Sequence, residues 1–260
     1  MPRDKCPIRK LPERKLKGAF LKRAGMKIKQ WFLSEPGVIL VAAILTLLVL
    51  AESILPPWAP YFIFYAILAI LIPWILKTYR FGSFGAVLKT HWKLILGVFA
   101  VAFILDEGVF TWLYEHALVG LGLGGNPFYS LSAALTALAD KAALKFGITP
   151  DAALMLYAAF IVLWAPIGEE LFYRGYLQGV LRRFQSFRVS ALVSAGFFGI
   201  RHATHLFFLW PHVPVVAAVS WVVGAFIFGL LMSYLYEKTR SLYPLILVHA
   251  GVNLLELIWM

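Results

Sequence analysis

Long apolar runs recur along the chain, and they restrict the folds that it can adopt more than any single motif does. A helix needs about 20 residues to cross a bilayer core of about 30 Å. Seven stretches approach or exceed that length: 37–55, 59–76, 94–116, 152–182, 188–209, 214–236 and 242–260. Within lipid, helices are the expected structure because each one satisfies its own backbone hydrogen bonds. The sequence therefore predicts an all-α, polytopic membrane bundle of about seven transmembrane helices.

The composition excludes an ordinary soluble domain. Hydrophobic residues make up 61% of the 260 residues and charged residues 14%, against roughly 45–50% and about 25% in soluble domains. The single cysteine, Cys6, leaves no internal disulfide framework. No repeat or low-complexity segment divides the chain. We therefore expect a basic arm over 1–33, followed by one integral-membrane domain over 34–260.

Positive charge is concentrated at the start of the chain. Eleven of the 24 lysines and arginines lie in the first 30 residues. An arm of this kind before an apolar run indicates a cytoplasmic flank attracted to anionic lipid, rather than a nucleic-acid site. More than 30 mostly polar residues precede the first run, so we interpret that run as a retained span and not as a cleaved signal peptide. We expect a protein of the cytoplasmic membrane with its N-terminus inside and no nucleic-acid partner.

The stretch 128–147 is ambiguous, because Asp140, Lys141 and Lys145 crowd its last third. It could be an interfacial amphipathic helix or an eighth span. With seven spans, nine basic residues of the connections share the inner side with the N-terminal arm: Lys77, Arg80, Lys89, Lys93, Arg182, Arg183, Arg188, Lys238 and Arg240. An eighth span would move the last five of these outside. The positive-inside rule therefore favours seven crossings plus an interfacial or re-entrant helix.

Two adjacent carboxylates and an arginine occur at the end of the fourth apolar run, in LWAPIGEELFYRGYLQG (163–179). A charged residue at the centre of a membrane helix costs about 2.5–3.5 kcal/mol even on lenient scales, so a paired or functional role is expected. Glu170 and Arg174 are four residues apart and are predicted to pair on one helix face. Glu169 is rotated about 100° from Glu170 and can face a cavity instead. Alternatively, both glutamates merely occupy the first turn of a helix, where carboxylates are favoured.

Histidines in the following runs extend this group. Residue 186 is near the centre of the connection between two runs, and Glu169 and His202 are almost equally far from it, so the two could meet in an antiparallel helix pair. His249 and Asn253 share one face of the last helix. A Glu and a His can activate water, and a His and an Asn can donate hydrogen bonds to an oxyanion. This set suits a peptidase without a nucleophilic side chain or a metal, although each residue alone could be interfacial or could join two helices.

Three motifs of this region together resemble a known protein family. They are Glu169-Glu170-x-x-x-Arg174, Phe198-x-x-x-His202 and His249-x-x-x-Asn253. In this order and within apolar runs, they are similar to the motifs of the CAAX protease and bacteriocin-processing family of intramembrane endopeptidases, which includes the type II CAAX prenyl endopeptidases. The resemblance covers about residues 150–260. It implies an all-helical fold with the active site in a cavity between helices.

The resemblance also implies a role for each matching residue. Glu169 and His202 would activate a water molecule, and His249 with Asn253 would form the oxyanion site. Supporting roles would belong to Glu170, Arg174 and Phe198. Such an enzyme hydrolyses a peptide bond near the terminus of a membrane-associated peptide or protein, prenylated or not, without a metal or other cofactor.

Two other hypotheses fit the same residues. Glu169, His202 and His249 are an acceptable ligand set for zinc, although the sequence has no H-E-x-x-H motif. Acidic residues and histidines also build proton relays in membranes, so a transporter, an immunity protein or an inactive scaffold is the third hypothesis. Three residues lie outside the family pattern: Asp106, Glu107 and His205. We expect the acidic pair to be buried and hydrogen-bonded to neighbouring helices, and His205 to be interfacial.

Overall fold

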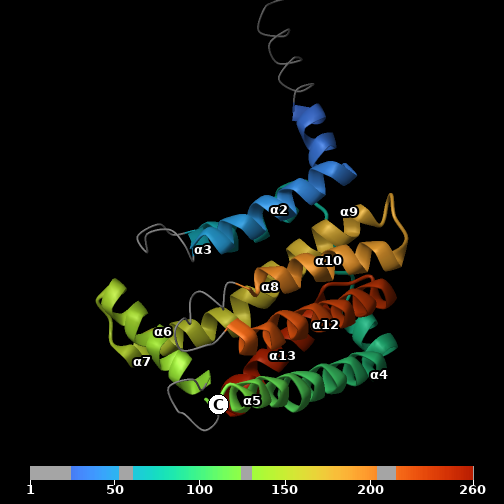
Figure 1. Ribbon diagram of the computed structural model, residues 1–260. Helices are drawn as coiled ribbons and strands as arrows, with labels where there is room; N and C mark the ends of the chain where they lie inside the picture. The colour runs from blue at the N-terminus through green and yellow to red at the C-terminus, as the bar shows by residue number, and fades with distance from the viewer. Residues whose placement is uncertain (1–24, 53–60, 124–130, 204–214, 260) are drawn as a thin grey trace, which may run out of the picture.

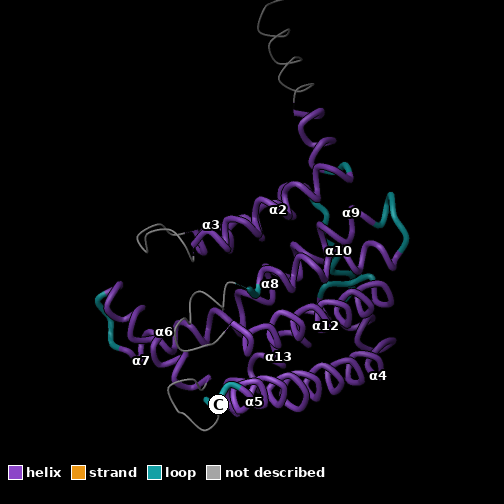
Figure 2. The backbone as a smooth tube through the Cα atoms, viewed as in Figure 1, coloured by secondary structure: helices purple, strands orange, loops and turns teal. Residues whose placement is uncertain are grey.

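The computed structural model describes residues 25–52, 61–123, 131–203 and 215–259. Within these ranges the chain consists of helices and short connections, and no strand occurs there (Figure 2). The predicted all-α class is therefore confirmed. Most of the basic arm and His205 lie outside the described residues.

The helices include several π-helical segments, which are labelled η. In chain order the elements are α2 (Glu35–Glu52), α3 (Tyr61–Leu76), α4 (Phe84–Phe103), η1 (Ile104–Phe110), α5 (Thr111–Gly120), α6 (Leu131–Phe146), α7 (Pro150–Ala159), η3 (Phe160–Trp164), α8 (Ala165–Glu169), η4 (Glu170–Gln178), α9 (Gly179–Leu181), α10 (Phe187–Arg201), α12 (Val215–Thr239) and α13 (Tyr243–Trp259). Some consecutive elements join into one continuous helical rod. The rod from α4 to α5 has 37 residues, and the rod from α7 to α9 has 32. Figure 1 shows the helices of the bundle stacked side by side.

Within the described residues, three helices are long and apolar enough to cross a membrane: Phe84–Gly120, Pro150–Leu181 and Val219–Thr239. A fourth crossing results if Gly25–Phe32 and Glu35–Leu50, which meet at 75°, form one bent span. The predicted span 188–209 is shorter than expected, because its helix α10 ends at Arg201 after 15 residues. That length is only about 22 Å, less than a bilayer core. An all-α membrane bundle fits these helices, and seven crossings stay a prediction.

The ambiguous stretch forms the helix α6, which projects with the start of α7 from one end of the bundle (Figure 1). Asp140 and Lys141 are exposed. A small cluster of alanines, Ala139, Ala143 and Ala153, joins α6 to α7. By length and composition α6 does not qualify as a span. This placement agrees with the interfacial helix that the charge distribution favours.

The π-helical segment η4 lies at the centre of the bundle, and all nine of its residues are buried. Phe172, Tyr176 and Leu177 pack into one core cluster with residues of α2, α3 and α10. Leu171 packs into a second cluster with residues of α4, α12 and α13. Because apolar neighbours cover η4 on two sides, the polar side chains that it carries are held away from lipid and water.

Hydrogen bonds to backbone carbonyls fix η4 against its neighbours. Ser194 Oγ of α10 donates to the Tyr173 carbonyl over 2.8 Å. Gln178 Nε2 donates to the Ser233 carbonyl of α12 over 3.2 Å. Buried polar groups normally have such partners. The first bond sets the register of the hairpin formed by η4 and α10, and the second fixes η4 against α12.

Glycines let α10 and α12 approach closely. A Cβ atom on Gly229 would lie 3.0 Å from Ala195 of α10, and one on Gly199 would lie 3.0 Å from Phe226 Cβ of α12. Small residues at such positions are typical of packed membrane helices. The close contact leaves the Gly229 carbonyl within hydrogen-bonding distance of Arg174 on η4.

Candidate active site

Glu170 and Arg174 form the predicted ion pair at the centre of the bundle. Arg174 Nη1 donates to Glu170 Oε1 over 3.1 Å, and neither side chain has any exposed surface. Arg174 Nη2 donates to the Gly229 carbonyl of α12, also over 3.1 Å. The pair thus connects η4 to α12. A buried guanidinium with two partners is held in one orientation, since its planar fork fixes the direction of each bond.

His249 of α13 lies between the two glutamates. Its Nδ1 atom is 2.9 Å from Glu170 Oε1, and its Nε2 atom is 3.8 Å from Glu169 Oε2. Glu170 Oε1 already accepts from Arg174, so the same oxygen is the acceptor here as well and His249 Nδ1 carries the hydrogen of this bond. The other ring nitrogen is therefore aimed at Glu169. This arrangement brings α13 to both carboxylates at the junction of α8 and η4.

Arg201 connects Glu169 to His202. The Arg201 Nη2 atom donates to Glu169 Oε1 and lies 3.2 Å from His202 Nε2. His202 Nδ1 lies 2.8 Å from the Phe198 carbonyl, which can only accept, so Nδ1 carries the hydrogen and Nε2 is the acceptor. Glu169 and His202 thus share the Arg201 Nη2 amino group, which has two hydrogens to donate. The hairpin places the two predicted residues at this common point.

Arg201 was not anticipated by the sequence analysis, although a signal for it exists. It stands in the apolar run FFGIRHATH and is buried with an exposed fraction of 6%. The reasoning that selected Arg174, that a charge in an apolar run needs a partner, applies equally to Arg201. Its position next to His202 drew attention to the imidazole instead.

Phe198 forms an aromatic wall between the two halves of the cluster. The guanidinium carbon of Arg174 lies 4.6 Å from the centre of its ring, a cation–π contact. The rings of His202 and His249 lie 4.7 and 6.0 Å away, centre to centre. Phe198 therefore contacts Arg174, His202 and His249. These contacts agree with the supporting role that the resemblance implies for it.

Asn253 lies at the edge of this group. Its Nδ2 atom donates to the Ile161 carbonyl of η3 over 2.7 Å. It is one helical turn beyond His249 on α13, as the sequence predicts. In this conformation its amide hydrogen is used by the backbone of η3 rather than directed at the carboxylates.

The remaining polar candidates do not join the cluster directly. Among the described residues, no group of three or more His, Cys, Asp or Glu side chains could hold a metal ion, so the ligand set Glu169, His202 and His249 is not assembled in this conformation. Asp106 of η1 lines a small cavity of about 10 Å³ together with Phe228. The Phe228 ring also contacts the His249 ring, with centres 4.9 Å apart. Asp106 is therefore one aromatic ring away from the cluster.

Comparison with protein-family models places this cluster in a known family segment. Residues 151–255 match the model described as type II CAAX prenyl endopeptidase Rce1-like. The match runs from the start of α7 into α13 and includes every residue of the cluster. Searches of the curated proteins and of the solved structures each gave no match. The family resemblance and its extent, predicted from three motifs, are confirmed.

Proposed function

Because residues 151–255 match the type II CAAX prenyl endopeptidase Rce1-like model, we propose that the protein is an intramembrane endopeptidase of the glutamate type. It hydrolyses a peptide bond near the terminus of a membrane-associated peptide or protein. One observation carries the proposal: His249 lies between the carboxylates of Glu169 and Glu170 inside a buried, charge-balanced group. Two glutamates face two arginines there, so the group is stable without external ions.

The two glutamates have different surroundings, which supports a division of labour between them. Glu170 Oε1 accepts from both Arg174 and His249, so this oxygen is committed to holding the cluster together, while Glu170 Oε2 is buried without a hydrogen-bond partner among the described residues. Glu169 Oε1 accepts from Arg201, which also contacts His202, and Glu169 Oε2 faces the more distant His249 Nε2. A carboxylate placed beside two imidazoles is suited to act as a general base. We therefore assign this role to Glu169.

The water that attacks the substrate binds where Glu169 and His202 converge. Both residues now accept from the Arg201 Nη2 amino group, so the same two acceptors can receive the two hydrogens of one water molecule when Arg201 shifts. Glu169 takes one proton as the water oxygen bonds to the scissile carbonyl carbon. The carbon–nitrogen bond then breaks, and the leaving amine receives that proton.

His249 and Asn253 stabilise the oxyanion of the tetrahedral intermediate. In this role His249 carries a hydrogen on each ring nitrogen, with Nδ1 donating to Glu170 and Nε2, which faces Glu169, donating to the oxyanion. Asn253 contributes its amide hydrogen after exchanging the Ile161 carbonyl for the substrate. Two such donors act most strongly where water is excluded. Arg174 and Phe198 hold Glu170 and the imidazole rings in place.

We further propose that the end of the bundle with the α9–α10 turn faces the cytoplasm. Gln185 Nε2 in this turn donates to Glu35 Oε1 over 2.7 Å, so the first span begins at the same end. The basic N-terminal arm precedes that span directly. The excess of arginine and lysine at this end agrees with the positive-inside rule. This orientation puts the N-terminus inside.

The proposal is tested by mass spectrometry of new peptide termini in membranes that contain wild-type protein, Glu169→Gln or Glu115→Gln. Glu115 is exposed on α5 and serves as the matched control. We expect a set of termini in the wild type and the control that is absent from Glu169→Gln, with all three proteins folded in the membrane. Identical termini in all three would overturn the proposal and leave a transporter or scaffold. Loss of wild-type cleavage after exhaustive chelation would replace the metal-free mechanism by the metal-dependent one.

A further inference from the structure

A cavity at the basic end of the bundle has not been used by the proposed reaction. It has a volume of about 190 Å³ and is formed where three connections meet, those between α3 and α4, α9 and α10, and α12 and α13. Figure 1 shows these connections at the same end of the molecule. Its lining residues are Thr78, Arg80, Gly179, Arg182, Arg183, Tyr236 and Arg240.

The charge of this cavity is unbalanced. Four of its lining residues are arginines, and among the described residues Glu237 is the one carboxylate that pairs with them. Arg182 binds Glu237 through two bonds of 3.3 and 3.1 Å, and Arg240 binds the same carboxylate over 2.7 Å. Four guanidinium groups against one carboxylate leave three positive charges. Arg80 and Arg183 are exposed and have no acidic partner within the described part of the chain.

Neutral hydrogen-bond donors complete the cavity. Thr78 Oγ1 is buried and has no hydrogen-bond partner among the described residues. Buried hydroxyl groups are normally satisfied, so an orphaned one in a cavity wall indicates a missing partner. The Tyr236 side chain, also a lining residue, is buried as well. Guanidinium and hydroxyl groups around one space are the donors that phosphate oxygens accept from.

Arg240, one of the lining arginines, has a strained backbone. Its φ is 51° directly after α12. This left-handed conformation usually belongs to glycine and is unfavourable for other residues. Arginine near a helix C-terminus gains something from the helix dipole. The same arginine lines the cavity.

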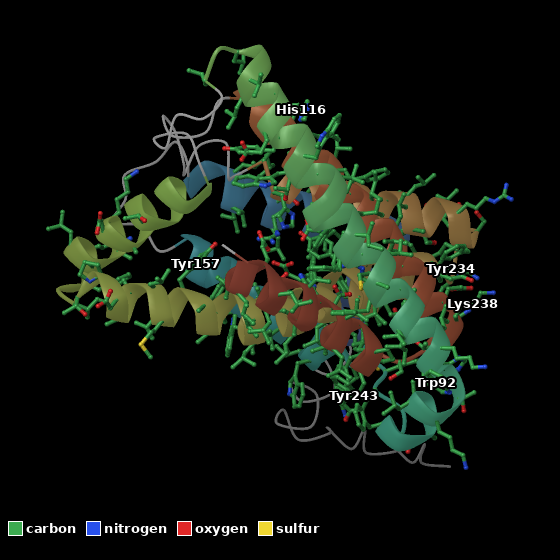
Figure 3. All side chains as sticks on the ribbon, turned by 90° about the horizontal axis from the view of Figure 1, so that it is seen from below. Trp92, His116, Tyr157, Tyr234, Lys238 and Tyr243 are labelled. Atoms are coloured by element: carbon green, nitrogen blue, oxygen red, sulfur yellow. The ribbon has the colours of Figure 1, made fainter. Side chains whose placement is uncertain are left out.

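The cavity lies at the level where a bilayer presents its head groups. Trp92 and Tyr234 are exposed near this end, and the amines of Lys93 and Lys238 lie 5.6 and 5.5 Å above their rings. Figure 3 shows Trp92, Tyr234 and Lys238 together at one end of the molecule, away from His116 and Tyr157. Exposed aromatic and basic residues of this kind mark the membrane–water interface.

We propose that this arginine-lined cavity binds the phosphate group of an anionic phospholipid from the adjacent leaflet. The ligand is a phosphate ester, and the acyl chains would extend along the lipid-facing helices. Arg182 follows Glu170 by twelve residues and comes directly after the end of the same rod, a distance of about 18 Å along the helix axis. The cavity is therefore separate from the active site, and its occupant does not block the reaction. Basic pockets between membrane helices are suited to bind lipid head groups.

Native mass spectrometry of the full-length protein in detergent tests this proposal. The protein is titrated with phosphatidylglycerol or phosphatidylcholine, and both titrations are repeated with the double variant Arg80→Gln/Arg240→Gln. The matched control is Lys89→Gln/Lys93→Gln, which removes the same charge from the same end outside the cavity. We expect wild type and control to retain phosphatidylglycerol over phosphatidylcholine, and the cavity variant to bind it about tenfold or more weakly.

Three results would overturn the proposal. Equal losses in the cavity variant and the control would indicate diffuse attraction without a site. Displacement of the lipid by millimolar inorganic phosphate, but not by sodium chloride of equal ionic strength, would assign the cavity to a soluble phosphate. Retention of an acidic peptide without retention of lipid would assign it to a peptide ligand. If the double variant is not monodisperse, the single variant Arg183→Gln, at an exposed position, replaces it.

Discussion

Charged side chains gather at two places in this molecule, and the two places balance their charge differently. In the buried cluster, two glutamates face two arginines, and no side chain of these four exceeds an exposed fraction of 7%. In the cavity at the basic end, four arginines stand against one carboxylate, Glu237, which pairs with two of them and has a side chain that is 18% exposed. Where water and lipid head groups are absent, each charge needs a protein partner. Where they are present, an excess can persist and attract an anion.

This difference has a consequence for function. A cluster that neutralises itself has no need of an ionic ligand, so its polar groups can be directed at an uncharged peptide bond. A cavity with surplus positive charge is suited to binding and not to proton transfer, since arginine keeps its proton. Arginine thus supports the proposed reaction in the buried cluster and the binding of an anion in the cavity at the basic end. Substitutions should therefore have large effects in the cluster and small effects at the basic end.

The largest effect is expected for His202→Ala in the cluster. Removal of an acid–base group lowers the rate by roughly 10²–10⁴, and the helix should persist because His202 is at the end of α10. The rate is measured with purified protein on a substrate found from its new termini. His116→Ala is the matched control, because His116 is exposed on α5 and contacts Trp112 of its own helix, through the backbone carbonyl and the indole ring. Similar rates for both variants would remove His202 from the reaction.

The next effect is on folding, in Arg174→Ala. The change leaves Glu170 without its guanidinium in a dry interior, and breaking such a buried pair costs about 3–5 kcal/mol. We expect poor yield and a strongly lowered unfolding temperature in detergent. Arg240→Ala is the comparison, because half of that side chain is exposed and such pairs contribute roughly 0–1 kcal/mol. An Arg174→Ala protein as stable as Arg240→Ala would contradict the role of the buried pair.

Asn253→Ala should reduce turnover by roughly 10²–10³ if Asn253 donates to the oxyanion. Its bond to the Ile161 carbonyl also connects α13 to η3, so stability has to be measured alongside the rate. A lower kcat with unchanged unfolding temperature supports the oxyanion role. An unchanged kcat with reduced stability would make Asn253 a structural residue.

The smallest effect is expected for Arg182→Gln at the basic end. Its pair with Glu237 is partly exposed, so the variant should lose no more than about 1 kcal/mol of stability. Cleavage of a substrate in detergent should stay within about twofold of wild type. Thermal unfolding and initial rates check both statements. A loss as large as that of His202→Ala would show that the two regions are not independent.

The sequence predicted the helices and the local pair well, and the contacts between helices less well. Apolar runs become helices because lipid leaves the backbone no other partner. Glu170 and Arg174 meet because a spacing of four residues places them on one face. Contacts across helices depend on how each helix is rotated, and the π-helical segments η1, η3 and η4 alter that rotation. No residue pattern in the chain announces those segments.

Three particular contacts illustrate that limit. Arg201 joins Glu169 to His202, although residue spacing suggested direct contact between the two. His249 donates to Glu170, which the sequence had paired with Arg174 alone. Asn253 binds the backbone of η3. Each of these depends on side-chain direction across a helix interface, and only the packed bundle determines that direction.

The most direct test of the central claim compares two carboxylates, one from each region. Cleavage of one identified substrate is measured with purified wild type, Glu169→Gln and Glu237→Gln, each shown to be folded. If the buried cluster is the active site, the rate falls by roughly 10²-fold or more in Glu169→Gln. In Glu237→Gln it falls by less than about twofold, because the ion pairs of Glu237 are partly exposed and contribute little. Equal rates for the two variants would contradict the assignment of the reaction to the cluster.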